Sequence, residues 1–311
     1  MTLADQEWVV ILNPFAGKKK GIKHKDRIFK LLEKYKISFQ PFITEHGGHA
    51  IELTQQLIEK GHRKIIGIGG DGTMNEIVNG IFTQQSVSPS EVVMAFIPVG
   101  SGNDWVRTVG IPHDYEGAIK TIKTGSFFLH DVGKVTYQAG DSRKVRYFAN
   151  IAGLAYDAFV VQRVNKKRSG NYKLTVLTAL MKYKPQVVKL ILDDQEVFNE
   201  IMFSAAIGHG KYNGKGMMQL PEAMPDDGVF DLTVYHACTK MQVIKNTNKL
   251  YDGSFVKLPF ISQYTAAKIR IEAEKPVYVE TDGEELGHTS IEMEMITRGL
   301  RIISGIKNKM V

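Results

Sequence analysis

Residues 64–80 read KIIGIGGDGTMNEIVNG, an apolar run that breaks into glycines and then resumes with helical spacing. The run 65–68 is typical of a buried strand, and the apolar residues after the glycines share one face of a helix. The glycines permit positive φ angles and let a ligand approach the backbone closely. A strand, a glycine turn and a helix N-terminus direct several backbone N–H groups at one point, so the stretch predicts a phosphate-binding site.

Two polar residues extend this prediction. Asp71 lies inside the glycine turn, and a carboxylate beside bound phosphate makes sense only if a cation bridges the two. Thr73 is predicted to cap the helix. The turn also matches the dinucleotide pattern G-x-G-x-x-G, with Glu91 as the acid that follows about 20 residues later. The stretch therefore indicates a metal–nucleotide site and leaves a dinucleotide site open.

Strands and helices alternate over the first 130 residues. Predicted strands cover 8–12, 37–43, 65–68 and 92–99, and helical spacing follows the first three. This alternation predicts a parallel α/β sheet with right-handed crossovers. Ligands of such sheets bind outside the carboxyl ends of the strands, where the glycine-containing loops of this chain also fall.

After about residue 130 the pattern changes to consecutive strands separated by turns, with helical interludes at 173–183 and 241–250. The order of elements predicts a second, mainly antiparallel β-sandwich domain. The strands are predicted at 132–135, 145–151, 187–192, 200–207, 229–235, 267–273 and 277–279.

Composition limits the class of protein. The single cysteine, Cys238, excludes an intrachain disulfide, and the N-terminus lacks a basic and apolar leader, so we expect a cytoplasmic protein. The net charge of +7 would favour an anionic membrane surface. Basic stretches are not interleaved with stacking aromatics, so no nucleic-acid partner is predicted, and a homodimer is left open. The histidines show no metal-ligand spacing and are interpreted as ordinary.

Three motifs in this order resemble the diacylglycerol kinase catalytic family: NPFAG at 13–17, GGDGTMNE at 69–76 and PVGSGND at 98–104. With TDGE at 281–284 they span nearly the whole chain and are most similar to the bacterial soluble lipid kinases. The family includes sphingosine and ceramide kinases and shares the GGDGT core with NAD kinases. The resemblance implies an ATP-binding α/β domain of residues 1–130, to which 295–311 return, and a β-sandwich lipid domain of residues 131–294.

The resemblance also implies the activity: an ATP- and Mg²⁺-dependent kinase that phosphorylates a hydroxyl of diacylglycerol or a related lipid, peripheral to the inner face of the membrane. Phosphoryl transfer requires positioned phosphates and a cation that spreads their charge. The residues expected to provide these functions are Asn13, Pro14, Phe15, Ala16, Gly17, Thr44, Gly70, Asp71, Gly72, Thr73, Met74, Asn75, Glu76, Ser101, Asn103 and Asp104.

Two further sites are expected toward the C-terminus. Asp282 and Glu284 stand two residues apart in a turn after a strand, so their carboxylates can converge, and the resemblance implies that one of them accepts the proton of the lipid hydroxyl. Which of the two is the base stays open. The resemblance also implies a structural magnesium ion held by Asp227 and by the carbonyls of Met224 and Val229. Two alternatives remain, an NAD kinase and a lipid-binding protein that has lost catalysis.

Overall fold

The computed structural model describes residues 6–140, 142–166 and 172–306. The chain divides into two compact units, Met1–Val132 with Thr297–Val311 and Gly133–Ile296. Two strands, β5 (Ser126–Ala139) and β15 (Ile291–Ser304), contribute residues to both units.

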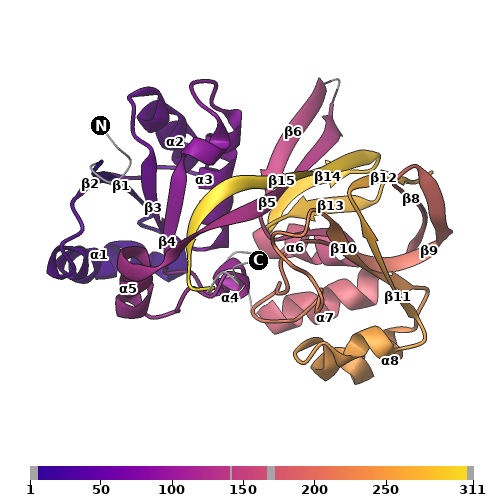
Figure 1. The fold of residues 1–311 in the computed structure, drawn as a ribbon. Helices are drawn as coiled ribbons and strands as arrows, with labels where there is room; N and C mark the ends of the chain where they lie inside the picture. The colour runs from indigo at the N-terminus through magenta and orange to yellow at the C-terminus, as the bar shows by residue number, and fades with distance from the viewer. Residues whose placement is uncertain (1–5, 141, 167–171, 307–311) are drawn as a thin grey trace. The chain divides into compact units, whose positions relative to one another are not determined.

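The first unit is a parallel sheet covered by helices (Figure 1, indigo to magenta). Its strands lie in the order β15-β4-β3-β1-β2, and every neighbouring pair is parallel. Helices α2 and α3 pack against each other, as do α1 and α5. The elements are β1 (Trp8–Leu12), α1 (Ala16–Lys34), β2 (Phe39–Ile43), α2 (His49–Glu59), β3 (Lys64–Gly69), α3 (Asp71–Thr83), η1 (Pro89–Glu91), β4 (Val93–Pro98), α4 (Asp104–Thr108) and α5 (Tyr115–Thr124).

Burial explains why the central strands read as unbroken apolar runs. Every residue of β1 and of β4 is buried, as parallel strands with both faces covered require. Strand β3 lies between them, with Ile65 opposite Val9 on one side and Met94 on the other. The register places the carboxyl ends of the three strands at one edge of the sheet. The predicted parallel α/β architecture is confirmed.

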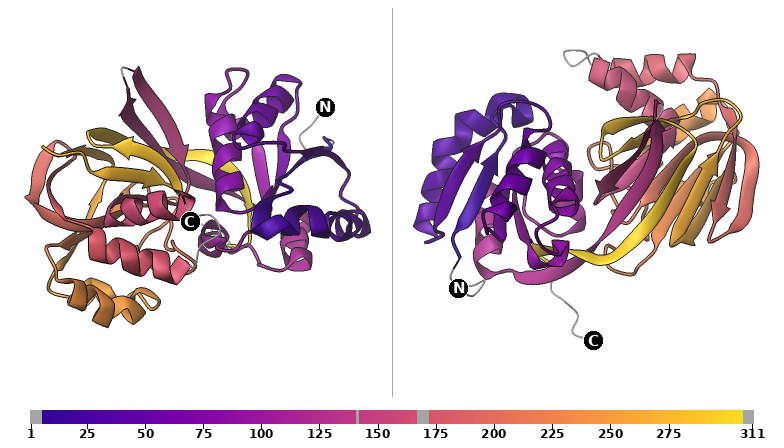
Figure 2. Two further views of the ribbon diagram at one scale, coloured as in Figure 1. Left: turned by 180° about the vertical axis from the view of Figure 1, so that it is seen from behind. Right: turned by 90° about the horizontal axis from the view of Figure 1, so that it is seen from above.

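The second unit is the predicted antiparallel β-sandwich (Figure 2, magenta to yellow). Its longest strand, β9, pairs with β7, β8 and β10 and thereby joins the strands into one structure. The remaining elements are β6 (Ser142–Phe148), β7 (Ile151–Ala155), α6 (Tyr156–Lys166), α7 (Tyr172–Lys182), β8 (Gln186–Leu192), β9 (Gln195–Gly208), β10 (Phe230–His236), α8 (Lys240–Asn246), η2 (Thr247–Leu250), η3 (Ser254–Lys257), β11 (Ile261–Ala266), β12 (Lys268–Glu272), β13 (Tyr278–Thr281) and β14 (Glu284–His288).

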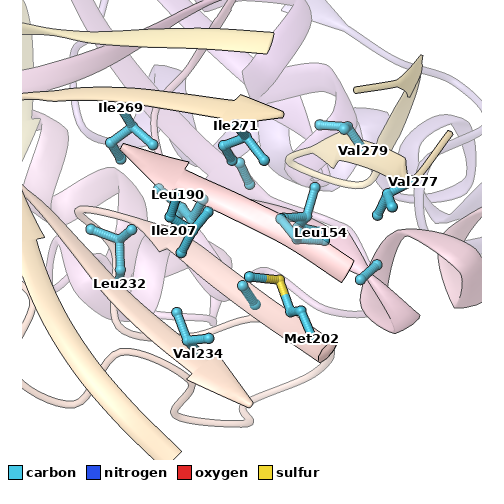
Figure 3. Close-up of a cluster of buried hydrophobic side chains, with 14 of the residues drawn as sticks. Leu154, Leu190, Met202, Ile207, Leu232, Val234, Ile269, Ile271, Val277 and Val279 are labelled. Atoms are coloured by element: carbon cyan, nitrogen blue, oxygen red, sulfur yellow. The ribbon is translucent and has the colours of Figure 1, made fainter. Parts of the chain in front are cut away.

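The core of the second unit is built from alternate residues of these strands. Leu190, Ile207, Leu232 and Ile269 lie in one buried cluster although they come from four different strands (Figure 3). A strand points successive side chains to opposite faces, so a single face of each strand supplies this core. The cluster fixes the register of the sheet, since a slip of one residue would turn its apolar face outward.

Several observed elements differ from the predicted ones. The strand predicted at 145–151 is two strands, because β6 ends at Phe148 and β7 begins at Ile151. Helix α6 was not predicted. It follows β7 directly, and its apolar residues form a continuous run at 158–161, which periodicity alone does not assign to a helix. Among the described residues, no helix is both long enough and apolar enough to cross a membrane.

Candidate active site

In the first unit, three loops meet at the carboxyl ends of β1, β3 and β4. The backbone N–H of Asn13 donates to the carbonyl of Ile68 (3.0 Å), and its side-chain amide donates to the hydroxyl of Thr73 (3.0 Å). A Cβ atom added at Gly17 would lie 2.0 Å from the carbonyl oxygen of Val99, so the first and third loops are also in close contact. The three sequence motifs of this unit thus form one surface.

Asp71 is the residue that ties the glycine turn to the third loop. Its carboxylate accepts hydrogen bonds from the backbone N–H groups of Asn103 (2.8 Å), Asp104 (3.0 Å) and Trp105 (3.3 Å). Burial and the nearby charge of Asp104 raise the pKa of Asp71 to about 6, although the three N–H donors oppose the shift. A divalent cation would offset this charge repulsion, and carboxylate oxygens are the ligands that Mg²⁺ prefers.

The backbone between these two acids is confined. A Cβ atom added at Gly102 would lie 3.0 Å from Oδ2 of Asp71 and 3.4 Å from Oδ2 of Asp104. Both carboxylates therefore border the same backbone position. The donor set consists of hard oxygens and fits a magnesium ion.

The glycines of the turn serve close packing and not positive φ angles. None of the turn glycines has a φ in the left-handed region. A Cβ atom at Gly69 would lie 2.3 Å from the hydroxyl of Thr73, and one at Gly70 would lie 3.1 Å from Cα of Gly100. The prediction that Thr73 caps the helix is wrong: the N-cap is Gly70 in an extended conformation, and α3 begins at Asp71. Thr73 instead lies in the first turn and accepts from Asn13.

Several other predicted nucleotide residues have structural contacts. Met74 and Asn75 are buried within α3, and the side chain of Thr44 is buried where its N–H extends the pairing of β1 with β2. Glu76 accepts from the backbone N–H groups of Gly48 (2.9 Å) and Ala50 (3.1 Å) at the start of α2. The first turn of α3 therefore offers a ligand its backbone, while these side chains hold the surrounding loops.

The remaining predicted nucleotide residues lie on the surfaces of the first and third loops. Phe15 is exposed, Pro14 and Ala16 are partly exposed, and Ser101 is exposed in the third loop. Asn103 is buried with a left-handed backbone (φ 54°), and its side-chain amide donates to the carbonyl of Gly100 (3.0 Å). Asn103 therefore fixes the shape of the third loop.

A cavity of about 360 Å³ adjoins the third loop. Its walls include Ser101 and Asn103 together with the cationic side chains of Lys20, Arg27 and Arg107. One acid, Asp114, also lines the cavity, and Arg107 forms an ion pair with Asp104 (3.7 Å). The three cations outnumber Asp114 and suit an anionic group such as phosphate. Arg27 and Arg107 were missed in the sequence because neither belongs to a motif.

The dinucleotide interpretation of Glu91 is not supported by its position. Glu91 lies in η1, where its carboxylate accepts from the backbone N–H of Ser88 (3.1 Å) in a capping box. Its spacing from the glycine turn therefore reflects a local cap.

In the second unit, Asp282 anchors the turn between β13 and β14. Its two carboxylate oxygens accept from the buried N–H groups of Ala149 (3.1 Å) and Ile151 (3.2 Å), and its own N–H donates to the carbonyl of Ile151 (2.9 Å). Asp282 has a left-handed backbone (φ 49°), as does Gly283 (φ 87°). Glu284 is exposed. The two acids of the motif thus differ: Asp282 is held on both oxygens, and Glu284 is accessible to solvent.

Two acids beside this turn, the buried Glu280 and the partly buried Asp157, were not identified from the sequence. A Cβ atom added at Gly153 would lie 2.4 Å from a carboxylate oxygen of Asp157 and 2.5 Å from one of Glu280. Burial raises the pKa of Asp157 to about 6, and burial together with the charge of Asp157 raises the pKa of Glu280 well above its usual value. Glu280 also accepts from the N–H of Gly283 (2.7 Å). Strand alternation back from Asp282 could have indicated Glu280, but no pattern marks Asp157.

The loop expected to hold a structural magnesium ion is rich in carboxylates. Asp227 accepts from the N–H of Val229 (3.3 Å), and the side chain of Met224 is 51% exposed. Burial and the charges of Asp227 and Glu222 raise the pKa of Asp231 to about 6. A hard cation would relieve this repulsion, so the residues present fit such an ion.

Comparison with known proteins agrees with the sequence motifs. The model of the diacylglycerol kinase catalytic domain matches residues 7–135, and that of the YegS C-terminal NAD kinase beta sandwich-like domain matches residues 150–304. The chain belongs to the diacylglycerol kinase catalytic family. The resemblance stated from the motifs is thereby confirmed.

Individual relatives cover the chain almost completely. "Putative lipid kinase YtlR" of Bacillus subtilis (strain 168) is 28% identical and covers 95% of this chain and 98% of its own. A solved structure of a "putative diacylglycerol kinase" from Bacillus anthracis str. Sterne has a TM-score of 0.75 at 26% identity and covers 96% of this chain and 97% of its own. Yeast NADH kinase complexed with NADH has a TM-score of 0.54 at 11% identity, covering 97% of this chain and 84% of its own, and shares the fold alone.

Proposed function

We propose that this protein is an ATP- and magnesium-dependent kinase that transfers a phosphoryl group to a hydroxyl of diacylglycerol or a related lipid. The observation that carries the proposal is Asp71, a carboxylate fixed inside a glycine turn by three backbone N–H groups and placed beside Asp104. In a member of the diacylglycerol kinase catalytic family this arrangement suits the phosphates of ATP and their cation.

The first unit would bind the nucleotide. Backbone N–H groups of the glycine turn and the start of α3 are oriented by the sheet, so they need no rearrangement to bind phosphate. Lys20, Arg27 and Arg107 add positive charge in the adjoining cavity. Asp71 and Asp104 would hold the magnesium ion, which when bound spreads the negative charge of the phosphates.

The second unit would supply the proton acceptor. We assign this role to Glu284, because Asp282 is buried and held by the N–H groups of Ala149 and Ile151, whereas Glu284 is exposed. Glu284 would take the proton of the lipid hydroxyl while the hydroxyl oxygen bonds to the γ-phosphorus and the bond from that phosphorus to the β,γ-bridging oxygen breaks, releasing ADP. Asp282 would hold the turn that presents Glu284.

Two ancillary features belong to the same proposal. Asp227, with the carbonyls of Met224 and Val229, would hold a structural magnesium ion in the second unit. The net charge of +7 would bring the cytoplasmic protein to the anionic inner face of the membrane, where its substrate lies. Activity on vesicles should then rise with anionic lipid content and fall as salt screens the attraction.

The test is to incubate the purified protein with ATP, magnesium and a panel of acceptors that contains diacylglycerol, other hydroxyl-bearing lipids and NAD. We expect phosphate on a lipid and none on NAD. Phosphorylated NAD would establish the NAD kinase alternative. Lipid binding without transfer to any acceptor would establish the inactive alternative.

A further inference from the structure

Two histidines and a glutamate gather at the start of α2, and none of the three is assigned to ATP or its magnesium ion. One ligand atom each from His46, His49 and Glu52 lies within 4.8 Å of the other two. His46 and Glu52 are exposed and His49 is partly exposed, so all three can be reached from solvent. Two imidazoles and one carboxylate are a common ligand set for zinc.

Hydrogen bonds define the protonation of both rings. Nδ1 of His46 lies 3.0 Å from the carbonyl of Gly47, which can only accept, so Nδ1 carries the proton and Nε2 presents its lone pair. This is the usual state of a metal-binding histidine. Nδ1 of His49 accepts from the N–H of Glu45 (3.0 Å), so the ring is neutral and carries its proton on Nε2. The two rings are stacked, with centroids 4.7 Å apart and planes 11° apart.

We propose that His46, His49 and Glu52 form a binding site for a divalent transition metal of the zinc class. The nitrogen donors favour such ions over Mg²⁺ and Ca²⁺, which prefer oxygen ligands. The partial positive charge at the N-terminus of α2 opposes a cation. The carboxylate of Glu52 and that of Glu76, which accepts from the N–H groups on either side of His49, offset this charge.

Metal binding would alter a loop that is attached to the proposed nucleotide site. His49 must either exchange its bond from Glu45 for the metal or move its ring proton to Nδ1, which breaks the same bond. The backbone of Gly48 and Ala50 is bonded to Glu76, in the second turn of α3. The site is therefore placed to stabilise this part of the first unit, whatever the protein phosphorylates.

The experiment is a titration of the tag-free protein with Zn²⁺ against a chromophoric chelator, in excess Mg²⁺ so that oxygen-rich sites are already filled. We expect one equivalent of Zn²⁺ to bind the parent. His46→Ala and Glu52→Gln should each weaken binding at least tenfold, because even the outer partners of metal ligands are worth about 10- to 100-fold in affinity.

Two control variants distinguish this site from adventitious binding. His62→Ala removes a histidine just beyond the C-terminal end of α2, and Cys238→Ser removes the lone thiol of the chain; both should bind Zn²⁺ like the parent. Zn²⁺ should raise the thermal transition of the parent and of the controls and leave those of His46→Ala and Glu52→Gln unchanged, while all five proteins melt alike without metal. Binding by the two ligand variants at parental affinity, or no binding by the parent, would overturn the proposal.

Discussion

Asp71 in the first unit and Asp282 in the second occupy similar positions but differ in what surrounds them. Each lies in a turn beside glycine, and each accepts backbone N–H groups from another loop. Asp71 has a second acid, Asp104, beside it, and this repulsion calls for a cation. Next to Asp282 the motif acid is Glu284, which is exposed. The same pairing of a held acid with a second acid therefore suits metal binding in one unit and proton transfer in the other.

The largest effect is expected at the exposed acid. Glu284→Gln removes the proposed base and leaves in place the bonds by which Asp282 holds the turn. Loss of a general base typically lowers turnover by about 10² to 10⁴. Steady-state lipid phosphorylation measures this, with Glu285→Gln, the next exposed acid, as the matched control. If both variants lose the same share of turnover, Glu284 is not the specific proton acceptor.

The next largest loss of turnover is expected for a change at Asp71 in the first unit. Asp71→Asn keeps the size of the side chain and removes its charge, so transition-state charge stabilisation is lost and turnover should fall about 10²-fold or more. Its amide N–H₂ also leaves at least one of the three N–H donors unpaired, so urea unfolding of this variant is the control for folding. The measurement is ATP-dependent transfer to the lipid that the panel identifies. Turnover within about threefold of the parent would exclude Asp71 from the metal and nucleotide site.

Asp282 should show its role mainly in stability. In Asp282→Asn an amide N–H₂ faces one of the buried N–H donors of Ala149 and Ile151 and leaves it unpaired, at a cost of about 1–3 kcal/mol in the free energy of unfolding. Asn tolerates the left-handed backbone, so the change isolates the hydrogen bond. Asp194→Asn, in another turn with positive φ, is the control in urea unfolding. If the two variants are equally stable, Asp282 does not anchor the turn.

Asp157 and Glu280, the two acids beside the Asp282 turn, are expected to have a smaller effect on the free energy of unfolding, and this effect depends on pH. Their pKa values are raised in the folded state, so the folded protein binds protons more tightly than the unfolded chain. The stability that this proton binding contributes is fully present below about pH 4 and is lost as the pH rises through 6 and above. Glu280→Gln keeps an acceptor for Gly283 and removes one charge. From pH 5 to pH 8 the parent should lose about 1–3 kcal/mol relative to this variant.

Urea unfolding of the parent and Glu280→Gln at several pH values provides the comparison. Parallel pH profiles would mean that Glu280 is not a proton-binding group in this range. If the free energy of unfolding falls more steeply with pH in Glu280→Gln than in the parent, the sign is opposite to that expected for a raised pKa of Glu280.

Sequence patterns predicted the elements whose structure follows from the spacing of apolar residues within the element itself. The run 64–69 and the helix after it are strongly patterned, and the strands that flank it are fully buried, so the parallel sheet was predictable. The reason for the turn glycines could not be predicted from the sequence. Gly69 packs closely against Thr73 and Gly70 against Gly100, and these contacts arise only in the folded structure. Thr73 was assigned as a cap since its type suits one, but α3 already begins at Asp71 with Gly70 as its N-cap.

The site was predictable to a similar degree. The motif at 281–284 pointed to the turn but could not separate a held Asp282 from an exposed Glu284, since that depends on the N–H groups of Ala149 and Ile151, more than 130 residues away. Asp157 carries no pattern and meets Glu280 only in the folded sheet. Side chains that act through long-range contacts are those that the sequence did not reveal.

The most direct test of the account is the dissociation constant of ATP, in the presence of magnesium, for the parent, Asp71→Asn and Glu284→Gln. We assign nucleotide binding to the first unit and proton transfer to the second. Glu284→Gln should therefore bind ATP within about threefold of the parent while its turnover is low, and Asp71→Asn should bind at least about tenfold more weakly. Parental affinity in Asp71→Asn, or lost affinity in Glu284→Gln, would contradict this division of roles.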